Sequence, residues 1–162
     1  MENKRSNAPA TNEPTFKMDL PDWKRVYVPP EVEQLATAVV GAAFAVHQEL
    51  GPGLLESAYE ACLSHELRLR GVNHQLQLPV PLNYKGIRIE VGYRADVIVE
   101  EKLLVELKAV DQLLPVHTAQ VVTYLRLKRF PLGLLINFNE VLIKQGIHRV
   151  LNVPRSPGEV LT

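Results

Sequence analysis

The sequence has little of what secreted and membrane proteins usually carry. Its single cysteine, Cys62, excludes an internal disulfide and fits a reducing compartment. No apolar run approaches the ~18 residues that a membrane helix needs. The first residues also have no apolar segment of the kind found in a secretory signal. These absences lead us to expect a cytoplasmic protein with no membrane partner.

An excess of charge is also missing, because the chain has 18 basic and 18 acidic side chains among its 162 residues. A net charge near zero gives no global attraction to nucleic acid or to anionic membranes. Any binding of a polyanion must therefore depend on a local cluster. The length suits one domain with a real core, and 46% of the residues are hydrophobic.

Polar, proline-containing segments lie at both ends of the sequence. Their composition predicts disordered tails at residues 1–28 and 153–162. One folded domain is then expected over residues 29–152.

Two hydrophobic periodicities organise this domain. Residues 29–50 begin with two prolines and carry apolar side chains at helical spacing. Residues 54–70 predict a second helix, with Gly71 where a C-terminal cap belongs. The later segments are expected to form strands at 74–84, 92–99 and 102–110, a helix at 114–128, an apolar strand at 131–138 and a strand or strand plus turn at 140–151. A turn is expected at Lys85-Gly86. This order predicts an α/β fold with helices packed on a central mixed sheet.

Charged residues interrupt the apolar hairpin of residues 96–110. If alternation holds, burying both strands on one face pairs Val97 with Val105 and Ala95 with Leu107. The same register sets Asp96 opposite Glu106, where like charges are destabilising.

Something positive should therefore lie between Asp96 and Glu106. Lys108 can supply part of this charge, and a divalent metal can supply more, since Mg²⁺ is commonly held by one or two carboxylates. The alternative is a solvated face with ion pairs that contribute ~0–1 kcal/mol. Ile98 and Leu104 share that face and favour at least partial cover.

Asp96 followed by Glu106-Leu107-Lys108 resembles the active-site signature of the PD-(D/E)XK nuclease superfamily. The stretch from Gly53 through Glu56 to Tyr59 resembles the motif of the GxxExxY protein family, a branch of that superfamily. The pair Gln120 and Tyr124 matches the Q-x-x-x-Y motif of RecB-like nucleases. The resemblance covers roughly residues 32–151.

This resemblance implies a restriction-endonuclease-like core and a Mg²⁺-dependent phosphodiesterase in which Mn²⁺ can substitute. The substrate would be nucleic acid, and we expect DNA. The metal ligands would be the carboxylates of Asp96, Glu106 and Glu56, with the backbone carbonyl of Leu107. By the same resemblance, Lys108 would orient the attacking water and offset charge on the phosphate. Gln120 and Tyr124 would position the nucleic acid, the lysine or the water.

Other interpretations of the same residues stay open. Glu56 alone fits the first turn of a helix, where the dipole favours a carboxylate. Tyr59 is expected in the core with its hydroxyl reaching a neighbour, and His47 and His117 are expected to be packing or surface residues. Besides a nuclease, the fold could serve as a nucleic-acid-binding module with little or no catalysis, or as a protein-interaction module. A homodimer is compatible with each of these.

Overall fold

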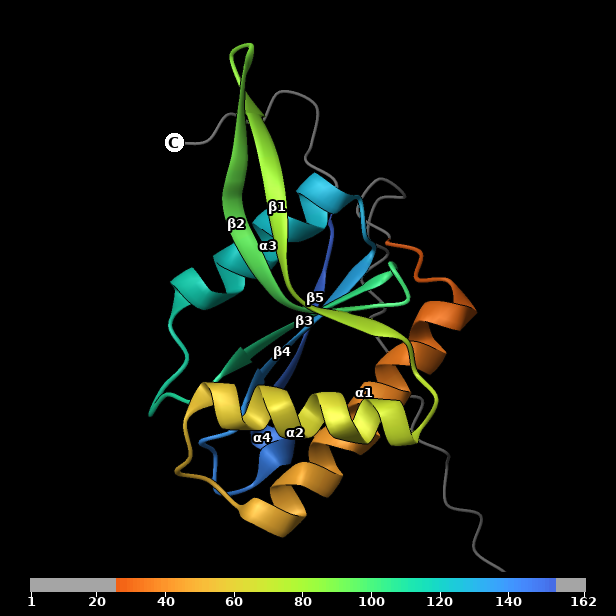
Figure 1. Ribbon diagram of the computed structural model, residues 1–162, viewed down its shortest axis with the longest axis vertical. Helices are drawn as coiled ribbons and strands as arrows, with labels where there is room; N and C mark the ends of the chain where they lie inside the picture. Colours follow the sequence, from red (N-terminus) through yellow and green to blue (C-terminus); the bar gives the residue numbers. More distant parts are fainter. Residues whose placement is uncertain (1–25, 154–162) are drawn as a thin grey trace, which may run out of the picture.

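The structure is a computed structural model that describes residues 26–153 (Figure 1). The predicted tails therefore lie almost entirely outside the described residues, and the division into tails and one domain stays a prediction. The described elements are α1 (Pro30–Leu50), α2 (Glu56–Leu69), β1 (His74–Tyr84), β2 (Ile87–Val99), β3 (Leu103–Lys108), α3 (Pro115–Lys128), β4 (Leu132–Asn137), α4 (Ile143–Gly146) and β5 (Ile147–Leu151).

The strands form one mixed sheet in the order β1-β2-β3-β4-β5. β3 and β4 are parallel, and the other neighbours are antiparallel. A parallel pair needs a crossover connection, and α3 provides it. The predicted α/β fold with helices on a central mixed sheet is thus confirmed. No helix among the described residues is long and apolar enough to cross a membrane.

Side chains on the two faces of the sheet form two hydrophobic cores. Val97, Val105 and Leu107 pack with α1 and α2 on one face. Ile98 and Leu104 pack with α3 on the other. Both faces of the central strands are therefore covered, which explains their nearly continuous apolar sequence.

The β2–β3 hairpin confirms the predicted register only over its first part. Val97 pairs with Val105, but the ladder ends there. Ala95 packs in the α3-side core, whereas Leu107 packs in the α1/α2-side core, so the predicted Ala95–Leu107 pairing is wrong. The reason is that β2 diverges from β3 and continues with β1 as a two-stranded arm (Figure 1).

Of the two remaining connections, one matches the prediction and one differs from it. Lys85 and Gly86 have φ values of 46° and 88°, which confirms the predicted turn at the tip of the arm. Residues 140–151, expected to form a strand or strand plus turn, instead contain the short helix α4 before β5. The buried Gly146 at the end of α4 has no side chain, and an added Cβ would collide with the backbone carbonyl of Asn137.

Candidate active site

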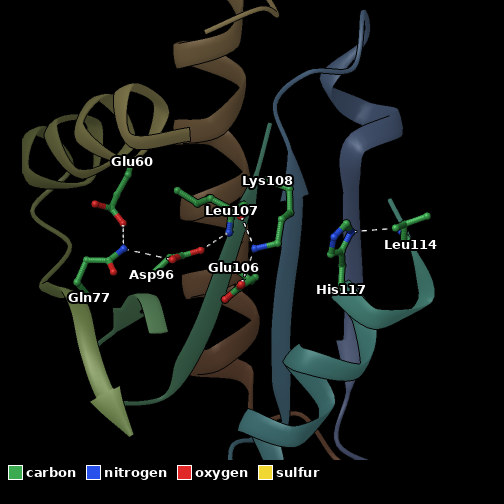
Figure 2. A network of polar contacts seen from close by, with 8 residues as sticks. All are labelled: Glu60, Gln77, Asp96, Glu106, Leu107, Lys108, Leu114 and His117. Atoms are coloured by element: carbon green, nitrogen blue, oxygen red, sulfur yellow. Dashed lines mark hydrogen bonds and ion pairs between the residues drawn. The ribbon is translucent and has the colours of Figure 1, made fainter. Parts of the chain in front are cut away.

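The divergence of β2 from β3 creates a fork that is filled by charged side chains (Figure 2). At the fork, the N–H of Leu107 donates to Asp96 Oδ2 at 2.9 Å. The carbonyl of Leu107 accepts from Lys108 Nζ, also at 2.9 Å. If the β2–β3 ladder continued, backbone groups of β2 would bond the N–H and the carbonyl of Leu107. Here side chains take that place, and the Leu107 carbonyl faces the charged group.

Lys108 also forms a largely buried ion pair with Glu106. The Nζ–Oε1 distance is 2.6 Å, and the two side chains are 13% and 3% exposed. The second carboxylate oxygen, Glu106 Oε2, is buried and has no hydrogen-bond partner. Burial is the main cause that raises the pKa of Glu106, and the charge of Asp96 raises it further. The hydrogen bond and the charge of Lys108 lower the same pKa, so Glu106 lies between a carboxylate and an ammonium.

Glu56, the first residue of α2, also lies near the charged side chains of the fork. Its pKa is raised mainly by burial, and the charges of Asp96 and Glu60 add to that rise. Lys108 and the backbone of Ala109 lower the pKa of Glu56. Glu56 therefore lies close enough to Asp96 and Lys108 for their charges to shift its pKa.

The loop before α2 is fixed by Tyr59, which explains why Glu56 is held at this place. The Tyr59 hydroxyl donates to the Gly51 carbonyl at 2.7 Å and accepts from the Leu54 N–H at 3.1 Å. Its ring is fully buried and stacks on Phe138. Gly53 has a φ of 103°, a conformation that glycine tolerates and other residues rarely adopt. The prediction of a core tyrosine with a satisfied hydroxyl is confirmed.

The α3 side of the fork contains a second polar group. Among the described residues, the buried side-chain atoms that lack a hydrogen-bond partner are Tyr93 Oη, Glu106 Oε2, Gln120 Oε1 and Tyr124 Oη. Tyr93 and Tyr124 pack edge to face; burial raises the pKa of both, and the charge of Glu106 raises it further. Both tyrosines and Gln120 line one pocket of about 280 Å³ between α3 and the β1–β2 arm. The structure thus places Gln120 and Tyr124 against the β1–β2 arm, with Tyr124 within range of the charge of Glu106.

Sequence reasoning missed three neighbours of the site, namely Glu60, Gln77 and Tyr93. Gln77 Nε2 donates to Asp96 Oδ1 at 3.2 Å and also to the Glu60 carboxylate (Figure 2). Glu60 could have been found, since it lies four residues after Glu56 and shares its helix face. Gln77 and Tyr93 gave no such signal, because polar and aromatic residues are ordinary on an edge hairpin.

His47 and His117 have the structural roles that were predicted. His47 is buried, and its Nε2 contacts the Glu140 carbonyl at 2.8 Å. His117 Nδ1 accepts from the Leu114 N–H at 3.0 Å and so caps the start of α3. Neither contact belongs to the charged fork.

The oxygen atoms of the fork match the ligand preference of a small divalent cation. Carboxylate and carbonyl oxygens suit Mg²⁺, and Asp96, Glu106 and Leu107 supply both kinds. Within the described residues, however, no three His, Cys, Asp or Glu side chains gather closely enough to hold a metal ion. The ammonium of Lys108 contacts Glu106 Oε1 and the Leu107 carbonyl, where it acts as the local cation. The unpartnered Glu106 Oε2 leaves one acceptor unused, so the donor set fits a metal that competes with Lys108.

Comparison with known proteins finds one family that matches most of the chain. The model of the PD-(D/E)XK nuclease superfamily matches residues 33–150, which include every residue of the fork. Neither a curated protein nor a solved structure gives a significant match. The family match spans well over half of the sequence and has the predicted α/β architecture, and the chain therefore belongs to the PD-(D/E)XK nuclease superfamily.

Proposed function

We propose that the protein is a metal-dependent nuclease of the GxxExxY branch, which hydrolyses phosphodiester bonds of nucleic acid, with DNA as the expected substrate. The observation that supports this most directly is the meeting of Asp96, Glu106 and Lys108 around the Leu107 carbonyl. Superfamily membership makes nucleic acid the expected substrate.

We assign the carboxylates of Asp96, Glu106 and Glu56 and the carbonyl of Leu107 as ligands for Mg²⁺ or Mn²⁺. A metal at such oxygens activates a water and stabilises charge on the phosphoryl group. Asp96 is already oriented by the Leu107 N–H, so it loses little freedom when it binds a cation.

Lys108 supplies the fixed positive charge of the proposed mechanism. Its ammonium is held by Glu106 Oε1 and the Leu107 carbonyl in a largely buried place. A charge that is oriented before the reaction stabilises developing negative charge without a cost of reorganisation. Asp96, Glu106 and the Leu107 carbonyl would hold the metal, and the Lys108 ammonium beside them would supply positive charge for the phosphate and the attacking water.

Substrate contacts are expected from the two elements that flank the fork. Gln120 and Tyr124 lie on the α3 wall, next to Tyr93 of the arm. Exposed basic groups lie on the same two elements, with Lys85 at the tip of the arm and Arg126 in the last turn of α3. Because phosphate contacts dominate nucleic-acid affinity, these local charges would compensate for the neutral net charge.

A screen of DNA and RNA substrates tests the proposal. Single strands, duplexes, flaps and junctions are incubated with Mg²⁺, with Mn²⁺ or with EDTA. We expect metal-dependent cleavage that falls about 100-fold or more in Lys108→Ala, the scale seen when one preorganised charge donor is removed. Cleavage that persists in EDTA, or at the parent rate in the variant, would contradict the assignment.

A second candidate function is nucleic-acid binding without catalysis. The observation that favours it is that Lys108 Nζ already pairs with Glu106 Oε1 at 2.6 Å, so this carboxylate has a cation without a metal. Oligonucleotide binding in EDTA, together with no cleavage of any substrate in Mg²⁺ or Mn²⁺, would assign this function instead. The cytoplasmic location and the homodimer stay predictions.

A further inference from the structure

Gln77 of β1 occupies an unfavourable backbone conformation directly across from Asp96. It lies between the ladder pairs Leu76–Val97 and Leu78–Ala95, where the Gln77–Asp96 pair is missing from the ladder. Its φ is 52°, in the left-handed region that a residue with a Cβ rarely adopts. Such strain persists where the surroundings enforce it, and it is common at functional sites.

The backbone conformation at Gln77 accounts for the turn of the arm. Leu76 packs against the α1/α2-side core, but Leu78, two residues later, packs against the α3-side core. Val97 and Ala95 on β2 change faces at the same point. A glycine would allow this change of face without strain. The bend therefore explains the positive φ but not the choice of glutamine.

The side chain of Gln77 explains that choice, because it connects two carboxylates. A side-chain amide carries two N–H donors, and Gln77 Nε2 donates to Asp96 Oδ1 at 3.2 Å and to the Glu60 carboxylate. The other oxygen of Asp96 accepts from the Leu107 N–H. Asp96 is therefore held at both oxygens, by β1 on one side and by β3 on the other (Figure 2).

We propose that Gln77 is a positioning residue that orients Asp96 and brings Glu60 into the acidic group of the site. Its kinetic consequence rests on the proposed nuclease function, whereas its effect on Asp96 does not. The amide donates to both Asp96 and Glu60, so it offsets the repulsion between them. Glu60 in turn adds to the negative charge felt by Glu56, one helical turn earlier. A glycine at this position would relieve the strain but would make neither contact.

Hydrogen exchange of the Leu107 amide tests the positioning without any assay of activity. That N–H is protected by the Asp96 side chain, so its exchange reports how firmly Asp96 is held. Gln77→Gly removes the bridge and also the backbone strain. We expect exchange at Leu107 to rise about tenfold, the scale of one hydrogen bond to a charged group, with little change in the melting temperature, because the relief of backbone strain opposes the loss of the bridge. Gln77→Asn tolerates a positive φ but is one methylene shorter, and it gives the same test if the glycine variant does not fold.

Glu101→Gly is the matched control, because Glu101 also has a positive φ, 54°, but lies exposed in the β2–β3 turn. It should leave Leu107 exchange unchanged. In an active parent, Gln77→Gly should lower kcat at least tenfold with little change in KM, and it should reduce the rise in melting temperature that Mn²⁺ produces. A Gln77→Gly variant with parental Leu107 exchange would overturn the proposal, as would a uniform rise over all of β2 and β3. If the parent neither cleaves nor responds to Mn²⁺, the nuclease function fails, and Leu107 exchange still decides the role of Gln77.

Discussion

The carboxylate of Asp96 accepts the backbone N–H of Leu107 at 2.9 Å, at the point where β2 leaves β3. The side chain of one strand thus replaces the backbone partner that a regular ladder would provide. This contact places a negative charge beside Glu106, whose pKa it raises. Because β2 diverges from β3 here, Asp96 and Glu106 lie in the same fork without being a ladder pair.

Asp96→Asn tests whether this fork binds a metal. In EDTA we expect the melting temperature to stay near that of the parent, because reduced repulsion on Glu106 and Glu56 offsets the loss of the acceptor oxygen that faces Gln77 Nε2. With Mn²⁺ at a hundredfold excess over Kd, the parent should gain about 2.7 kcal/mol and the variant much less. Thermal unfolding with and without the metal measures both. Glu101→Gln is the control. A parent whose melting temperature does not rise with Mn²⁺ would contradict the metal site.

Glu106→Gln tests the electrostatic cost of the fork through pH. The pKa of Glu106 is raised above its ordinary value of 4.5, so the folded state holds this proton more tightly than the unfolded chain does. That contribution to stability is present below the unfolded pKa and is lost as the pH rises through the folded pKa. Glutamine has no carboxyl group to ionise, so the stability of the variant does not fall in this way as the pH rises. In EDTA its stability relative to the parent should increase from about pH 4 to pH 7.

Urea unfolding at several pH values measures this difference. Two stability profiles that run parallel from pH 4 to pH 7 would show that Glu106 titrates normally. Glu100→Gln, at an exposed position of the β2–β3 turn, is the control for removing one carboxylate.

Lys108→Met tests the buried ion pair. Glu106 as a whole residue is 2% exposed. In the variant its carboxylate would lose its nearest cation, while its second oxygen has no partner. Removing one member of a buried pair costs about 3 kcal/mol or more at neutral pH. The double variant Lys108→Met/Glu106→Gln should recover most of this loss, because no buried charge is left alone. A double variant whose loss equals the sum of the single losses would show that the two side chains do not interact.

The sequence predicted the sheet well where each strand keeps one alternating pattern. Val97 and Val105 pair as expected, because both must be buried on the α1/α2 side. The prediction failed at Ala95, where β1 and β2 change faces together. No alternation in either strand marks that change, because it depends on the backbone of Gln77 and on the position of α3.

The site was predictable to the extent that a short motif encodes it. Asp96, Glu106 and Lys108 form a recognisable pattern, and the fold then brings Glu56 to them. Tyr93 and Gln77 could not be assigned, because their contacts cross between elements that are distant in sequence. Their roles follow from how the arm bends, which is a tertiary property.

Tyr59→Phe tests how α2 delivers Glu56 to the fork. The hydroxyl of Tyr59 bonds both Gly51 and Leu54, so its loss leaves two loop groups without a partner while the stacking on Phe138 is kept. We expect a loss of about 1–3 kcal/mol in the free energy of unfolding, and a smaller gain on adding Mn²⁺ because Glu56 is less firmly placed. Tyr84→Phe, at the exposed tip of the arm, should stay within about 0.5 kcal/mol of the parent. If the two substitutions have equal effects on urea unfolding, the hydroxyl of Tyr59 does not stabilise the loop. If Tyr59→Phe responds to Mn²⁺ as the parent does, the loop does not control how Glu56 contributes to the metal site.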